Sequence, residues 1–201
     1  MDSKTLDNST QASHQGFFRV TRAEYARYRA SMPWKRAALF LLSFTSPRLH
    51  RQPWAGGGVR WQRFREHFHY GDTTPAQVLD ARSGLVAAYT DLDTQGLYRF
   101  PVINIFIEKL HLARTRLQDG EQVATFSLYW RSPSVSSERW GGFNPIVARC
   151  VSADQAACDA ARDKIPSAHW QALQVGLQQV PKPWKPGLYH ITLPPEITVR
   201  F

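Results

Sequence analysis

Histidine and carboxylate side chains gather with four aromatic rings in the stretch WQRFREHFHYGD, from Trp61 to Asp72. If this stretch were a strand, His67 and His69 would point to the same face, because side chains alternate along a strand. Such a pair could begin a zinc site, yet zinc needs three or four converging ligands. The histidines weighed as further ligands stand singly in the sequence: His111, His169 and His190. The sequence therefore favours surface or hydrogen-bonded histidines and predicts no metal and no cofactor.

Other motifs that carry chemistry are incomplete. Asp91, Asp93 and Gly96 imitate the first half of a calcium-binding loop. The twelfth position, which should supply a bidentate glutamate, is Val102. Gly56–Gly58 lacks the Lys-Ser/Thr of a phosphate-binding loop, and no Gly-x-Ser-x-Gly or His-Glu-x-x-His pattern occurs. We expect no catalytic residues, and an enzyme of unrecognised type is the third alternative.

Basic and aromatic residues are interleaved between Arg60 and Tyr70. Trp61, Phe64 and Phe68 recur at the i, i+3, i+7 spacing of one buried helical face. The arginines then lie on the exposed side, where guanidinium groups bind phosphates or carboxylates. The predicted partner-binding residues are Arg48, Arg51, Arg60, Arg63 and Arg65.

The net charge of +9 comes from one quarter of the chain. Between Phe17 and Arg65 there are eleven lysines or arginines and one acid, Glu24. From Glu66 onward acids and bases balance. Such one-sided charge attracts an acidic partner, which could be nucleic acid, anionic lipid or an acidic protein.

The first residues of the chain are predicted to be a polar lead followed by a helix. Residues 1–16 are polar and are expected to be disordered. Thr21 and Glu24 have the spacing of a capping box, which predicts a helix from about Arg22 to Ser31.

A basic helical arm is predicted over residues 17–59. Its apolar segment Trp34–Phe44 is too short to span a bilayer and is expected to pack on the main body. The alternative is an interfacial helix lying on anionic lipid. The prolines and Gly56–Gly58 that follow predict a linker.

Residues 60–201 are predicted to form a single α+β domain. A short helix over Trp61–His67 is expected to lead into the first strand and turn at residues 68–72. Gln118–Glu121 is predicted to be a hairpin turn. Runs of β-branched and aromatic residues predict strands at Ala76–Ala81, Leu85–Thr90, Arg99–Ile107, Val123–Trp130 and Ile146–Val151.

The last third of the chain is predicted to be mainly helical. One helix is expected from Ser152 to about Lys164 and another after Ser167, followed by strands at Tyr189–Leu193 and Ile197–Phe201. The predicted fold is therefore α+β: a small curled antiparallel sheet or barrel, packed with C-terminal helices and preceded by the basic arm.

Several segments resemble a bacterial family that is described only as a domain of unknown function. They are YGDTTPAQVL (70–79), GLVAAYTDLD (84–93), PVINI (101–105), WGGFNPIVARCV (140–151) and IPSAHWQALQVGLQQVPKPWKPGLY (165–189). The last block is the most specific part, and the resemblance covers about residues 60–190. It implies one coherent domain of strands followed by helices, and it supplies no catalytic residue.

The compartment and role follow from these observations. The N-terminus lacks the features of a secretory signal, and Cys150 and Cys158 match neither a zinc pair nor a disulfide scaffold, so we expect a cytoplasmic protein with reduced thiols. The expected role is non-enzymatic binding of an acidic macromolecular partner, such as that of an immunity or adaptor protein. A protein partner is favoured, and nucleic acid bound by the basic arm is the alternative.

Overall fold

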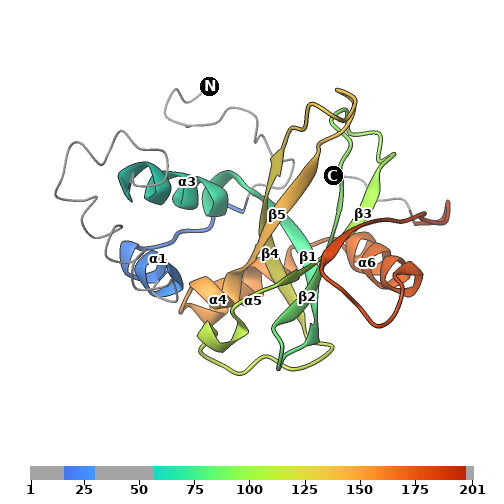
Figure 1. Ribbon diagram of the computed structural model, residues 1–201. Coiled ribbons are helices and arrows are strands. Elements are labelled where there is room, and N and C mark those ends of the chain that lie inside the picture. The colour runs from blue at the N-terminus through green and yellow to red at the C-terminus, as the bar shows by residue number, and fades with distance from the viewer. Residues whose placement is uncertain (1–15, 30–56, 198–201) are drawn as a thin grey trace.

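The computed structural model describes residues 16–29 and 57–197, with only the backbone for residues 57–60. Its centre is a six-stranded antiparallel sheet in the order β5-β4-β1-β2-β3-β6 (Figure 1). The strands are β1 (Asp72–Asp80), β2 (Leu85–Asp91), β3 (Pro101–Ile107), β4 (Gln122–Trp130), β5 (Gly142–Val147) and β6 (Gly187–His190). The helices are α1 (Arg22–Arg29), α3 (Gly57–Tyr70), α4 (Ala148–Val151), α5 (Gln155–Asp163) and α6 (Ser167–Gln179), with a 3₁₀ turn η2 (Leu110–Leu112).

The sheet curls into a half-barrel with β5 and β6 at its edges, and two side-chain hydrogen bonds join β5 to β3 and to the residue after β3; we call this line of contacts the seam. Asn104 Nδ2 donates to the carbonyl oxygen of Phe143 across the seam (3.2 Å). Nearby, the amide of Val147 donates to Glu108 Oε2 (3.2 Å). The curl encloses an apolar interior, because alternate residues of each strand face inward. Members of this interior cluster include Ala76, Val78, Val86, Ala88, Val102, Val123, Phe143 and Val147.

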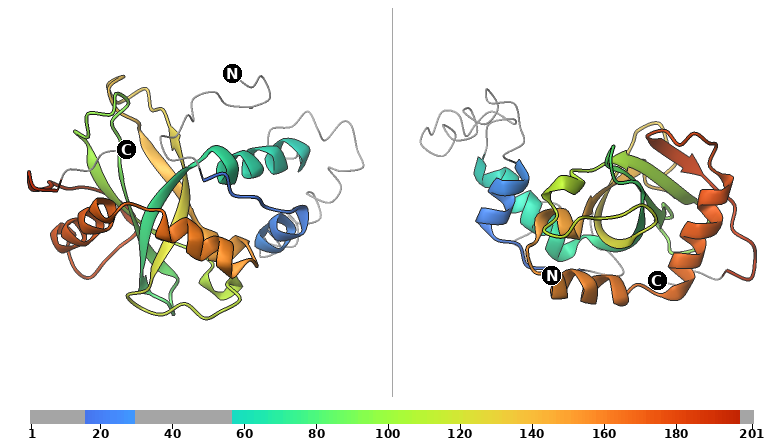
Figure 2. Two further views of the ribbon diagram at one scale, coloured as in Figure 1. Left: turned by 180° about the vertical axis from the view of Figure 1, so that it is seen from behind. Right: turned by 90° about the horizontal axis from the view of Figure 1, so that it is seen from below.

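Helices cover the outer face of the sheet in two groups, as the view from below shows (Figure 2). α6 packs over β1, β2 and β3, where Leu173 and Leu177 meet Tyr89 and Ile103. α3, α4 and α5 pack over β4, around Phe126. α1 lies against α3 and α4, so the described part of the N-terminal quarter shares a core with the sheet.

The structure confirms the predicted α+β class and the curled antiparallel sheet with C-terminal helices. The predicted strand Ile146–Val151 is only partly right, since β5 ends at Val147 and α4 follows. A helical turn buries Ala148, Cys150 and Val151 together, which an alternating strand with one solvent face does not allow.

Three further local predictions are wrong. Residues 68–70 continue α3 instead of opening a strand, because Phe68 is on the buried face of that helix. Gln118–Glu121 forms a turn, but it is not the turn of a hairpin, since β4 pairs with β1 and β5. Gly57 and Gly58, expected in a linker, are the first residues of α3.

Several predictions fall outside the described residues. They concern the polar lead 1–15, the end of the first helix after Arg29, the apolar segment Trp34–Phe44 of the arm, and the last strand at residues 198–201. The division of the chain at residue 60 stays a prediction.

Candidate functional site

α3 separates aromatic side chains from basic ones. Phe64 and Phe68 are buried, and Trp61 packs partly buried against the same cluster. Ring centroids lie 4.9 Å apart for Phe64 and Phe68 and 5.1 Å apart for Phe68 and Phe126. Arg63 and Arg65 are exposed. The i, i+3, i+7 pattern is thus confirmed as a packing face, and these three rings contribute to the core.

Residues 16–18 close the C-terminal end of α3. The amides of Gly16, Phe17 and Phe18 donate to the carbonyl oxygens of residues 71, 69 and 68, at 3.1, 3.0 and 3.0 Å. Carbonyls at a helix end have no partner within the helix, so these bonds satisfy them. They also hold Phe17 at a φ of +45°, which is unusual for a bulky residue. The Phe17 ring is 63% exposed, with its edge against His69.

α1 docks through its capping box and through Glu24. The Thr21 amide donates to Glu24 Oε2 (2.7 Å), and the Glu24 amide donates to Thr21 Oγ1 (3.2 Å), which confirms the predicted box. Glu24 Oε1 accepts from the Ser152 hydroxyl (3.0 Å) and the Ala153 amide (3.1 Å). Burial would raise the pKa of Glu24, but these hydrogen bonds hold it below the usual value.

A second anchor for α1 is the buried carboxylate of Glu108. Tyr28 donates its hydroxyl to this carboxylate (3.1 and 3.3 Å), which also accepts from the Lys109 amide (2.7 Å). Lys109 Nζ in turn donates to the carbonyl oxygen of Tyr28 (2.8 Å). Burial raises the pKa of Glu108, although the hydrogen bonds oppose this effect. Because Glu108 also bridges the seam to Val147, one residue ties α1 to the half-barrel.

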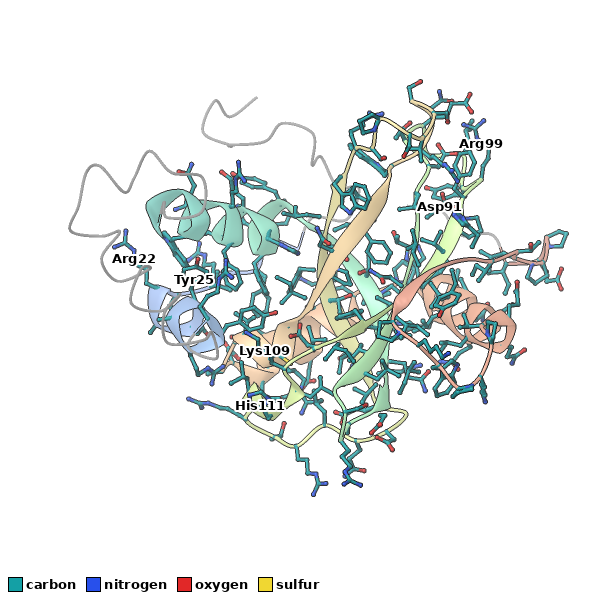
Figure 3. The ribbon with its side chains drawn as sticks, in the orientation of Figure 1. Arg22, Tyr25, Asp91, Arg99, Lys109 and His111 are labelled. Carbon is teal, nitrogen blue, oxygen red and sulfur yellow. The ribbon has the colours of Figure 1, made fainter. Side chains whose placement is uncertain are left out.

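The surface of this N-terminal layer is basic because four of its arginines are exposed while its two described acids are largely covered. We call these exposed arginines, Arg19, Arg22, Arg63 and Arg65, the basic face. In Figure 3, Arg22 points outward from α1, whereas Tyr25 points toward α3. None of the four arginines makes an ion pair within the described ranges. Of the two acids in the layer, Glu24 holds the hydrogen bonds given above and Glu66 is 8% exposed.

Two grooves flank the chain between Gly16 and Val20. The groove beside α5, which we call the α5 groove, has a volume of about 470 Å³. A second groove of about 360 Å³ lies beside α3 and is lined by Arg65, Glu66, His69 and Tyr70 among others. Arg19 lines both grooves. The basic face and the α5 groove are therefore contiguous.

The predicted partner-binding residues are only partly described. Arg63 and Arg65 lie exposed on α3, as expected. Arg60 is in the first turns of α3, and its side chain is outside the described part, as are Arg48 and Arg51 entirely. Arg19 was counted among the basic residues of the N-terminal quarter but was not predicted to bind a partner. No local sequence pattern shows that residues 16–20 lie beside α3.

His67 and His69 do not form a pair, since both are on a helix. His67 is 6% exposed, and its Nε2 lies 2.6 Å from the carbonyl oxygen of Phe126. Desolvation lowers the pKa of His67 to about 4, against smaller opposing effects of the Phe126 and Asn144 carbonyls. His67 is therefore a neutral residue that connects α3 to the sheet.

Burial raises the pKa of Asp91 to about 6. Its Oδ1 accepts from the amides of Asp93 (2.8 Å) and Phe100 (3.2 Å). Asp93 pairs with Arg99 (2.9 Å). Asp91 and Arg99 lie at the end of the sheet away from α1 (Figure 3), and Asp91 lines neither groove. These contacts order the loop from 91 to 100.

The thiols are poor nucleophiles. Cys150 and Cys158 are free and buried, and burial raises the pKa of both, for Cys158 to about 12. Among the described residues there is no group of three or more His, Cys, Asp or Glu side chains placed to hold a metal ion. Within the same ranges, no helix has the length and apolar character to cross a membrane.

Comparison with known proteins gives a family and a similar structure. The sequence profile of a family described as "Protein of unknown function (DUF3239)" matches residues 60–181, which confirms the resemblance seen in the sequence. A crystal structure of "a putative membrane protein from Corynebacterium diphtheriae" is similar at 18% identity with a TM-score of 0.48. That similarity covers 60% of this chain and 100% of the other. No curated protein matches the sequence.

Proposed function

Because the chain belongs to the DUF3239 family of proteins of unknown function, we propose its role from geometry alone: non-enzymatic docking of an acidic protein partner on the basic face. The observation that carries this proposal is the separation of charge in the N-terminal layer. Glu24 is hydrogen-bonded to Ser152 and Ala153, and Glu66 is 8% exposed where it lines the groove beside α3. The arginines of the basic face are instead exposed to solvent without ion-pair partners in the described ranges. Complementary charge steers association and fixes the orientation of a partner.

A protein is favoured over nucleic acid by the positions of the aromatic rings. Proteins that bind single-stranded nucleic acid stack bases on exposed rings. Phe64 and Phe68 are instead buried, so α3 offers arginines without those rings. Phe17 is exposed near Arg19, but a single ring does not form the row on which successive bases stack. An immunity protein or an adaptor would use such a face. A cytoplasmic location is part of the proposal, and the free, buried thiols of Cys150 and Cys158 support it.

The test uses fluorescein-labelled poly-L-glutamate as an acidic polypeptide. The charge-reversal pair Arg63→Glu and Arg65→Glu should weaken its binding at least tenfold, a loss of about 1.4 kcal/mol. The matched control reverses two exposed arginines elsewhere, Arg82→Glu and Arg114→Glu, and should change binding less than twofold. Equal losses in both double variants would contradict a localised face.

Two further titrations separate the classes of partner. A DNA duplex bound more tightly than polyglutamate through Arg63 and Arg65, with affinity falling steeply with salt, would favour the nucleic-acid alternative. Preferential, arginine-dependent binding to phosphatidylglycerol vesicles would favour a lipid surface. Affinity purification from the source cell with the wild type and the Arg63/Arg65 variant should then identify proteins whose capture depends on the arginines.

A further inference from the structure

We infer that the α5 groove is an anchoring site for an acidic peptide segment of the partner that inserts an apolar side chain. This inference rests on the proposed function and names the part of the surface that would give specificity. The residues that carry the argument form an apolar floor, a basic rim and an exposed ring.

The floor of the groove is apolar and made of small side chains. Ala157, Ala160 and Ala161 recur at helical spacing, so they share one face of α5. Phe18 and Ile165 complete the floor, and both are buried in the core beneath it. Alanines extend little above the helix backbone, which leaves about 470 Å³ above them. This space suits a branched or aromatic side chain better than a charged one.

The rim supplies charge complementary to an acidic segment. Arg19 lies on the rim from the residue 16–20 side and Lys164 from the C-terminal end of α5, and both are exposed. The acid of the groove, Asp154, sits at the N-terminal end of α5, where its carboxylate caps the helix by accepting from the Ala157 amide (3.0 Å). Carboxylates that flank an apolar anchor would therefore meet Arg19 and Lys164.

Phe17 provides a fixed apolar contact beside the groove. Its exposed fraction of 63% is the largest among the exposed large hydrophobic residues of the described ranges. The backbone around it is held by the three hydrogen bonds that backbone amides donate to carbonyl oxygens at the C-terminal end of α3. An exposed aromatic ring on an ordered backbone beside an apolar depression is typical of an interface hot spot. The positive φ of Phe17 is therefore maintained at a position where the ring can contact a partner.

The experiment compares three labelled peptides by fluorescence anisotropy. EEDFLDEE has both acid and an apolar anchor, EEDSSDEE lacks the anchor, and KKRFLRKK has reversed charge. The full-length protein should bind EEDFLDEE at least tenfold more tightly than either of the others. Equal binding of EEDFLDEE and EEDSSDEE would overturn the apolar anchor, and preference for KKRFLRKK would overturn the charge assignment.

Two tryptophan variants test whether the peptide binds in the α5 groove. Ala160→Trp fills the groove from an exposed position and should weaken EEDFLDEE binding at least tenfold. Gln171→Trp adds the same ring to an exposed position of α6 that does not line the groove, and should leave binding within twofold. Similar effects of the two variants would overturn the location. Circular dichroism with a thermal melt establishes that both variants are folded.

Polyglutamate separates this inference from the proposed function, because it has no apolar side chain. If Arg63 and Arg65 control polyglutamate binding but Ala160→Trp does not affect EEDFLDEE, the anchoring site is wrong and the basic face stands. If Ala160→Trp abolishes EEDFLDEE binding while the arginine variant leaves polyglutamate unaffected, the basic face is wrong and the groove stands.

Discussion

Acidification should destabilise the protein through His67, which is buried in its neutral form. Its pKa is about 4 in the folded state, against an ordinary value of 6.5 that also applies to the unfolded chain. A lowered folded pKa means that the unfolded state binds the proton more readily as the pH falls. The contribution of His67 is therefore fully present above pH 6.5 and is lost as the pH falls toward 4. The loss is about 2 kcal/mol between pH 7 and pH 5, and about 3 kcal/mol between pH 8 and pH 4.

The measurement compares urea unfolding of the wild type and His67→Gln at several pH values. Glutamine keeps an amide donor for the Phe126 carbonyl oxygen but does not titrate. The comparison is needed because the raised pKa of Asp91, about 6, makes the folded protein more stable as the pH falls. This gain partly masks the loss due to His67 when the wild type is measured alone. The stability advantage of the wild type over the variant should shrink by about 2 kcal/mol from pH 7 to pH 5.

A control and a contradictory outcome complete this experiment. The matched control is His111→Gln, which makes the same substitution at an exposed position and is measured at the same pH values. If the difference between the wild type and His67→Gln were the same at pH 7 and pH 5, His67 would not be held neutral by burial. The link between α3 and β4 would then need another explanation.

Three further predictions concern contacts between the helices and the sheet and the burial of the two cysteines. Tyr28→Phe removes the hydroxyl that donates to Glu108 and should lower the free energy of unfolding by about 1.5 kcal/mol in urea titrations; an unchanged value would show that the bond does not anchor α1. Gly71→Ala would place a Cβ 2.1 Å from a carbonyl oxygen of α3, so it should cost about 2 kcal/mol and lower the Tm by about 6 °C, and an unchanged Tm would contradict the close approach. Cys150 and Cys158 should react with a thiol reagent at pH 8 only after denaturation, whereas rapid modification of the native protein would contradict their burial.

Features that depend on neighbours in the sequence were predictable. The Thr21 and Glu24 capping box forms because both partners belong to one helical turn. The buried aromatic face of α3 and the exposed positions of Arg63 and Arg65 follow from helical periodicity in the same way. Periodicity became ambiguous at Ile146–Val151, where a run of apolar residues suits either a strand or a buried helical turn.

The sequence by itself therefore determined most of the element types, the confinement of positive charge to one quarter of the chain, and the exposure of Arg63 and Arg65 on α3. Only the tertiary structure decided that β4 pairs with β1, that Glu108 reaches both Tyr28 and Val147, and that the residues before Val20 meet α5 to form a groove. Local patterns specify which face of an element is buried, but not which distant element covers it. That choice depends on the arrangement that buries every apolar face at once while pairing buried polar groups such as His67 and Glu108.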